Sequence, residues 1–199
     1  MKSIIKLSNY LKNRGGIASF SEIIGAGFNK VTIQKSIKAG HVEKLDRGIY
    51  VSSEGITLPY PDFAVVSIKV PQGVICLLSA LSYYDLTDEI PKHVDVAIPR
   101  NTHANKVNYP PVNFYHFSRK SWEAGIEEIK TEGKSIKIYS ISKTIADCFK
   151  FRNKIGVDVA REALKIALKD KKSDPKEILK YSKICRVYNI VKPILEVML

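Results

Sequence analysis

The chain has 199 residues, which is long enough for one large domain or two small ones, each with a buried core. Charged residues make up 26% of the chain, as in ordinary globular proteins, and no apolar run approaches the roughly 18 residues that span a bilayer. Thirty-two Lys and Arg against twenty Asp and Glu give a formal charge of +12. Nucleic acid is therefore the leading expected partner class, ahead of an anionic membrane surface, although a charge that serves only solubility is an equal alternative.

The first residues predict two helices. The start MKSIIKLSNYLKNRGG lacks the continuous apolar core of a signal peptide, and its apolar residues follow the spacing of an amphipathic helix. Gly15 and Gly16 are expected to end that helix. The segment SFSE, residues 19–22, has serine followed three positions later by glutamate, which is the pattern of a capping box and opens a second, short helix.

A third helix and a hairpin follow. Asn29 is suited to cap a helix in which Ile33 and Ile37 face inward four residues apart, and Gly40 is expected to end it. Two short strands then pair across the turn at residues 46–48, Asp-Arg-Gly. The order helix, helix, turn, helix, two-stranded wing is typical of a winged helix-turn-helix, which we assign to residues 1–55.

This fold accounts for the basic side chains of the region. A helix fits the major groove, where Gln pairs with adenine and Lys with guanine or phosphate, and a wing reaches the flanking backbone. Residues 1–55 hold nine basic and four acidic side chains. The predicted DNA-contacting residues are Lys30, Gln34, Lys35 and Lys38 on the helix and Lys44 and Arg47 on the wing. The alternative is a protein-interaction module whose lysines only solvate its surface.

The rest of the chain has a different composition and a different pattern of apolar residues. A linker is predicted near residues 53–61, where serine, glycine and two prolines interrupt any periodicity. After it come a helix-like segment and short strands rich in aromatic and β-branched residues, and from residue 142 the pattern is helical nearly to the end. Asp158 is a candidate cap there, and Asp174-Pro175 opens the last helix. We therefore predict an α+β protein in which a mixed α/β domain with a helical C-terminal end spans residues 62–199.

The cysteines and histidines point away from metal chemistry. Cys76, Cys148 and Cys185 are odd in number, far apart and embedded in apolar segments, which favours buried, reduced thiols over a disulfide frame or a zinc site. The four histidines form no spacing typical of metal ligands. We therefore expect a cytoplasmic protein without a metal, a cofactor or a membrane partner.

Three segments resemble a known family. They are RGIY at 47–50, CLLSALSYYDLTDEIPKHVDVAIPR at 76–100 and YSISKTIADCFKFRNKIGVDVAREALKIAL at 139–168, and in this order they are similar to AbiEi-type antitoxins of type IV, abortive-infection systems. The resemblance covers almost the whole chain, although the last 26 residues add nothing specific to it. It implies a regulator that binds inverted repeats at its own promoter. It also implies an antitoxin that counteracts a neighbouring nucleotidyltransferase-type toxin in phage defence, without a stable complex.

Two alternatives belong to other classes. The first is an ordinary winged-helix transcription factor whose second domain senses a ligand or oligomerises. The second is a metal-dependent nuclease in which Asp95 and Glu128 hold Mg²⁺ and Lys130 activates water. Because Glu and Lys are abundant, an E-x-K tripeptide arises often by chance, and this one reads as a polar connection rather than a strand. We therefore predict no enzymatic activity and assign no catalytic residue.

Two conspicuous side chains have structural explanations. Trp122 is expected to be a packing anchor, because tryptophan is usually largely buried. Asp147 falls on an apolar helix with Arg152 five positions later, and a carboxylate on a packed face needs a donor nearby. A buried pairing or a capping role is predicted for Asp147.

Overall fold

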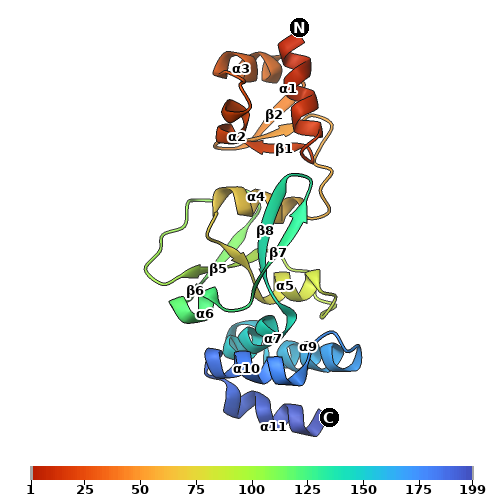
Figure 1. The fold of residues 1–199 in the computed structure, drawn as a ribbon, viewed down its shortest axis with the longest axis vertical. Coiled ribbons are helices and arrows are strands. Elements are labelled where there is room, and N and C mark those ends of the chain that lie inside the picture. The colour runs from red at the N-terminus through yellow and green to blue at the C-terminus, as the bar shows by residue number, and fades with distance from the viewer. Residues whose placement is uncertain (1, 199) are drawn as a thin grey trace. The chain divides into compact units, whose positions relative to one another are not determined.

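The computed structural model describes residues 2–198 and confirms the α+β class (Figure 1). The chain divides into two compact units. The first comprises Met1–Pro71, Asn105–Pro110 and Ile129–Ile136, and the second comprises Gln72–Ala104, Pro111–Glu128 and Lys137–Leu199. The first unit thus takes in segments that lie well beyond residue 55 in the sequence.

The first unit combines helices with a small antiparallel sheet, as Figure 1 shows in red and orange. Its elements are α1 (Lys2–Lys12), β1 (Ile17–Ser19), α2 (Phe20–Gly25), α3 (Lys30–Lys38), β2 (Val42–Asp46), β3 (Ile49–Ser52) and α4 (Pro61–Lys69). The strand order is β1-β3-β2, with both pairings antiparallel. Strand β1 was not among the predicted elements, because three residues are too few to show alternation.

The local signals act as the sequence predicts. The Ser19 hydroxyl accepts a hydrogen bond from the Glu22 amide at 3.1 Å, and Glu22 Oε2 accepts one from the Ser19 amide at 2.7 Å, which completes the capping box. Asn29 Oδ1 accepts from the Thr32 amide at 2.8 Å and starts α3. Gly16, at φ +81°, must be glycine, since a Cβ there would lie 2.2 Å from the Gly55 carbonyl oxygen.

A compact core holds these elements together. Helices α1 and α3 pack on each other, and α1 also contacts β3. The buried side chains are Leu7, Leu11, Ala18, Ile23, Ile33 and Val42. Aromatic rings of Tyr10, Phe20, Phe28 and Tyr50 close the edges of this core. The unit therefore presents α3 and the β2–β3 turn on a scaffold with its own hydrophobic centre.

The second unit is organised on a mixed sheet. Its strands are β4 (Val74–Ile75), β5 (Val94–Pro99), β6 (Val112–Phe117), β7 (Ile126–Thr131) and β8 (Lys134–Tyr139), the last two of which extend into segments of the first unit. The strand order is β6-β5-β4-β8-β7. Strand β4 is antiparallel to β5 and parallel to β8, and β5 is parallel to β6.

This unit also contains helices, of which those after residue 140 lie together near the C-terminus, in teal to blue in Figure 1. The helices are α5 (Leu77–Tyr83), α6 (Arg119–Glu123), α7 (Ile141–Lys150), α8 (Arg152–Ile155), α9 (Val157–Lys169), α10 (Pro175–Cys185) and α11 (Tyr188–Met198). Asp174 caps α10 by accepting from the Lys176 amide at 2.8 Å, as predicted.

Two details of the helical region were predicted wrongly. The expected single helix after residue 174 is two helices, because Arg186 adopts a left-handed conformation (φ 61°) that ends α10. Asp158 is not a cap, since Gly156 occupies that position of α9 without a side-chain hydrogen bond. At residue 186 neither glycine nor proline marks the end of the helix, so local composition gives no sign of this break.

The core of the second unit contains the features expected of Trp122 and the cysteines. Cys76, Cys148 and Cys185 are all buried free thiols, as predicted. Trp122 packs against the core as an anchor, and its carbonyl oxygen accepts a hydrogen bond from the Tyr139 hydroxyl at 2.9 Å. Among residues 2–198, no helix combines the length and apolar character needed to cross a bilayer.

Asp147 is paired inside this core, as predicted, but with another partner. Its side chain is fully buried and bonds to the ammonium of Lys143, which is fully buried as well. The Cys185 thiol donates to Asp147 Oδ1 at 3.1 Å, whereas Arg152 donates to a backbone carbonyl instead. Burial raises the pKa of Asp147, and Lys143 and Cys185 oppose that rise.

The surroundings of Lys143 explain why its charge is tolerated. The ammonium lies 4.0 Å from the centre of the Tyr139 ring and 4.9 Å from that of Phe117, so two aromatic faces and one carboxylate replace water. Gly125 covers the aliphatic stem, where a Cβ would lie 2.7 Å from Lys143 Cβ. The pair is thus built into the packing of the unit.

Candidate nucleic-acid interface

The predicted DNA-contacting residues all lie at the surface of the first unit. Exposed side chains are found at Lys30, Gln34, Lys35 and Lys38 of α3, at Lys44 of β2 and at Arg47 in the β2–β3 turn. Other cations of the unit are held in ion pairs, for example Arg14 and Lys134 with Glu22. Within residues 2–198, no ion pair engages the six predicted side chains. They therefore remain available to an anionic partner.

Helix α3 divides these residues between two faces. With about 3.6 residues per turn, residue 31 shares one face with Lys35 and Lys38, and Gln34 lies at the edge of that face. Ile33, 3% exposed, points to the core on the opposite side. Lys30 lies on the flank, where its ammonium is 5.8 Å from the centre of the Phe20 ring. Of the four residues predicted to contact DNA from α3, Lys35 and Lys38 therefore lie on the outward face, Gln34 lies at its edge and Lys30 lies outside it.

The inward position of Ile37 was predicted wrongly. Ile37 is 37% exposed, and the second buried residue of α3 is Ser36. Ile37 lies four residues after Ile33, a spacing that predicts the same buried face. Because of the way α1 packs on α3, however, the buried face continues through Ser36, three residues after Ile33. A small side chain at position 36 allows that close approach.

Val31 is a surface residue that the sequence interpretation missed. It is 56% exposed and is the most exposed large hydrophobic side chain of the first unit. Its spacing to Lys35 and Lys38, i+4 and i+7, could have identified it as the apolar member of the outward face.

The turn between β2 and β3 is anchored through Asp46. Its carboxylate accepts hydrogen bonds from the Arg47 amide at 2.6 Å and from Asn108 Nδ2 at 2.8 Å. It also pairs with the ammonium of Lys69 at 3.1 Å, and Lys69 donates to the Arg47 carbonyl oxygen at 2.9 Å. Gly48, at φ +78°, completes the reversal. The Arg47 side chain is therefore exposed, while hydrogen bonds to Asp46 and from Lys69 hold the backbone of the turn in place.

The charge of Asp46 is stabilised despite its burial. Burial alone would favour the neutral acid, but the bonds from Asn108, from the Arg47 amide and from Lys69 outweigh it and hold the pKa of Asp46 well below its usual range. The Asn108 partner was not apparent from the sequence, since it lies 62 positions away.

A second, partly buried anion fixes the helix that precedes α3. Glu22 of α2 is bound by Lys134 at 2.6 Å and Arg14 at 3.1 Å in addition to its capping bond with Ser19. Burial opposes its ionisation, yet the Lys134 and Ser19 hydrogen bonds lower the pKa of Glu22 to about 2. Two carboxylates, Glu22 before α3 and Asp46 after it in the sequence, thus hold segments of the unit together.

The nuclease constellation is not assembled. Asp95 is buried on β5, where it accepts hydrogen bonds from the Leu78 amide and the Asn113 side chain. Glu128 lies on β7, and strands β4 and β8 separate β5 from β7. The segment around Glu128 is a strand and not the predicted connection. Among residues 2–198, no cluster of His, Cys, Asp and Glu could hold a metal ion.

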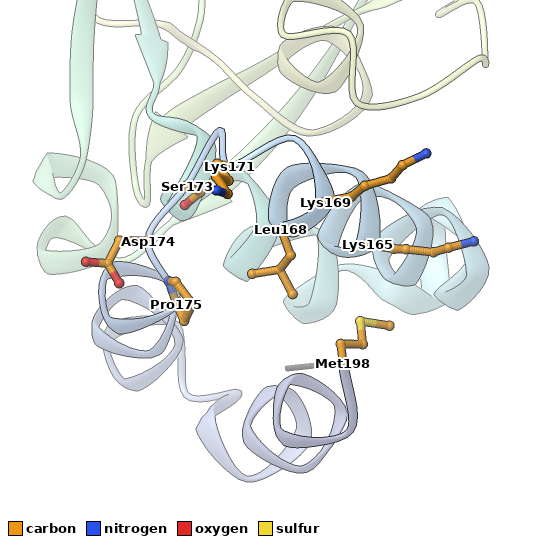
Figure 2. A pocket seen from close by; sticks show the side chains of 8 residues that line it. All are labelled: Lys165, Leu168, Lys169, Lys171, Ser173, Asp174, Pro175 and Met198. Carbon is orange, nitrogen blue, oxygen red and sulfur yellow. The ribbon is translucent and has the colours of Figure 1, made fainter.

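A pocket of about 780 Å³ lies in the second unit beside the end of α9 and the start of α10 (Figure 2). Leu168 points into it and Met198 borders it, whereas the side chains of Lys165 and Lys169 extend away. Asp174 is already engaged as the cap of α10. Ser173 is engaged as well, with the Ser142 hydroxyl at 2.6 Å, so both of these polar groups of the lining already have partners within the protein.

Comparison with known protein families and with curated proteins finds no match for this chain. The resemblance to AbiEi-type antitoxins therefore stays a prediction from the sequence segments that carry it.

Proposed function

We propose that the first unit is a winged helix-turn-helix that binds double-stranded DNA at the promoter of its own gene. In this proposal α3 enters the major groove and the β2–β3 turn contacts the adjacent backbone. The observation that carries it is the outward face of α3, whose Gln34, Lys35 and Lys38 are exposed and outside the ion pairs of the unit. Arg47 on the anchored turn adds a cation positioned for phosphate.

The DNA-binding proposal predicts two kinds of loss. Arg47→Ala and Lys44→Ala should weaken binding to all sequences about equally and lower the slope of log affinity against log salt by roughly one unit each, because one phosphate contact is lost. Gln34→Ala and Lys35→Ala should instead reduce the preference for the promoter by about 1–3 kcal/mol per lost base contact. Fluorescence anisotropy with promoter and unrelated duplexes at several salt concentrations measures both.

A matched control is Lys165→Ala, which removes an exposed lysine of α9 in the second unit. It should leave affinity and salt slope unchanged. If Lys35→Ala and Arg47→Ala bind the promoter as tightly as the parent, the unit is a protein-interaction module and not a DNA reader.

We further propose that the chain is a cytoplasmic antitoxin of the AbiEi type and has no enzymatic activity of its own. Support comes from the segments at 76–100 and 139–168, which resemble that family. Its functional partner would be a nucleotidyltransferase-type toxin encoded next to it, countered without a stable complex. An ordinary winged-helix regulator would lack such a neighbour.

The antitoxin role is tested by co-expression of the full chain with the neighbouring toxin. The parent chain should restore growth, and the double variant Lys35→Ala/Arg47→Ala should restore it equally when both are supplied from an unrelated promoter, because the segments at 76–100 and 139–168 are unchanged. Full-length variants are needed, since residues 1–55 hold partners of Lys69, Asn108 and Lys134. Failure of the parent to restore growth would contradict the antitoxin role and favour an ordinary regulator.

A further inference from the structure

The outward face of α3 contains an apolar group among its cations. Val31 is 56% exposed, although nothing in the fold of the unit requires an apolar side chain there. The same helix already buries Ile33 and Ser36 on its other side, so Val31 contributes nothing to the core. A solvated position on a basic helix would ordinarily hold a polar residue.

The position of Val31 along the helix narrows what it could contact. Asn29 caps α3, so Val31 lies in the first turn, and Lys35 and Lys38 follow on the same face. When a helix lies in the major groove, residues of its N-terminal part reach the base edges. The one apolar group that B-DNA displays in that groove is the 5-methyl group of thymine.

We propose that Val31 contacts the 5-methyl group of a thymine in the promoter and so selects thymine at that position. This inference rests on the proposed DNA binding by α3 and adds a base identity to it. The flanking cations supply the charge complementarity, since Lys35 and Lys38 are exposed and would hold the helix against phosphates or guanine. Val31 then supplies discrimination rather than general affinity.

The test replaces each thymine of the promoter footprint in turn by deoxyuridine, which removes only the 5-methyl group. With the parent chain, the thymine position that Val31 contacts should lose about fourfold in affinity, the value of one buried methyl-sized group. Val31→Ala should bind the unmodified promoter about that much more weakly and should no longer distinguish thymine from uracil at the same position. Anisotropy titrations at one fixed salt concentration give both numbers.

Two features keep the test interpretable. Alanine at an exposed helix position has the highest helix propensity, so Val31→Ala should remain folded. Ile5→Ala removes an equally exposed apolar side chain, 54%, from α1 and should leave the response to deoxyuridine intact.

The outcomes separate this inference from the function beneath it. A parent chain that does not bind the promoter at all overturns both. If it binds with the expected salt dependence but no thymine position responds to deoxyuridine, or if Val31→Ala responds as the parent does, the thymine contact is overturned and DNA binding stands.

Discussion

Replacing Asp147 by alanine is expected to lower the free energy of unfolding by about 3–5 kcal/mol, the usual cost of breaking a buried ion pair. The substitution leaves the ammonium of Lys143 fully buried without its carboxylate, and it removes the acceptor of the Cys185 thiol. The rings of Tyr139 and Phe117 beside the ammonium cannot replace a full negative charge. Urea unfolding followed by circular dichroism measures the change.

The chain offers a matched control for that measurement. Lys192 and Glu196 of α11 form an ion pair with the same order and spacing, but both side chains are exposed, at 45% and 60%. Lys192→Ala should therefore cost no more than about 0.5 kcal/mol. A cost for Asp147→Ala no larger than that would show that the buried pair does not stabilise the unit.

A double variant separates the charge from the packing. Lys143→Met/Asp147→Leu removes both charges together and fills the space with apolar groups, and such replacements are often neutral or stabilising. We therefore expect it to be more stable than Asp147→Ala. A double variant as unstable as the single one would indicate that the shape of the pair, and not its charge balance, matters.

Replacing Asp46 by alanine should destabilise the first unit by about 2–3 kcal/mol and weaken the proposed promoter binding as well. The carboxylate accepts bonds from the Arg47 amide and Asn108 and pairs with Lys69, which is 12% exposed and loses its counter-charge. With these bonds gone, the turn that carries Arg47 is no longer fixed. Unfolding and anisotropy measurements on the full chain test the two effects.

The stabilisation by Asp46 should also depend on pH. Its folded pKa lies below the unfolded value of 3.8, so its contribution is fully present above that value and is lost as the pH falls through the folded pKa. The difference in stability between the parent and Asp46→Ala should therefore shrink below about pH 4. Glu22, whose pKa is lowered to about 2, titrates in both chains and does not affect the difference.

An exposed carboxylate of the same unit serves as the control. Glu54 pairs with Lys12 at 2.7 Å, with exposed fractions of 68% and 40%. Glu54→Ala should change stability by less than about 0.5 kcal/mol and leave promoter binding unchanged. Equal effects of Asp46→Ala and Glu54→Ala would contradict the anchoring role of Asp46.

The elements of the first unit follow largely from local sequence. Ser19 with Glu22 and Asn29 with Thr32 form their bonds across three residues, so the signal for each helix start is complete within one turn of chain. The same holds for the glycines that end helices, because their backbone angles are a property of one residue. The exposure of Lys35 and Lys38 also follows from periodicity alone.

The tertiary structure decided which charged and polar side chains are buried and which groups they bond to. Asp46 accepts a hydrogen bond from Asn108, which lies 62 positions away in the sequence, and Asp147 accepts one from Cys185, which lies 38 positions away. Ser36 is buried and Ile37 is exposed, because the packing of α1 against α3 determines which face of α3 is covered. Such pairings depend on how elements pack, which no local pattern encodes. The sequence alone therefore determined the helix limits and the basic surface of the first unit, whereas the fold determined the anchored turn and the burial of the Lys143–Asp147 pair.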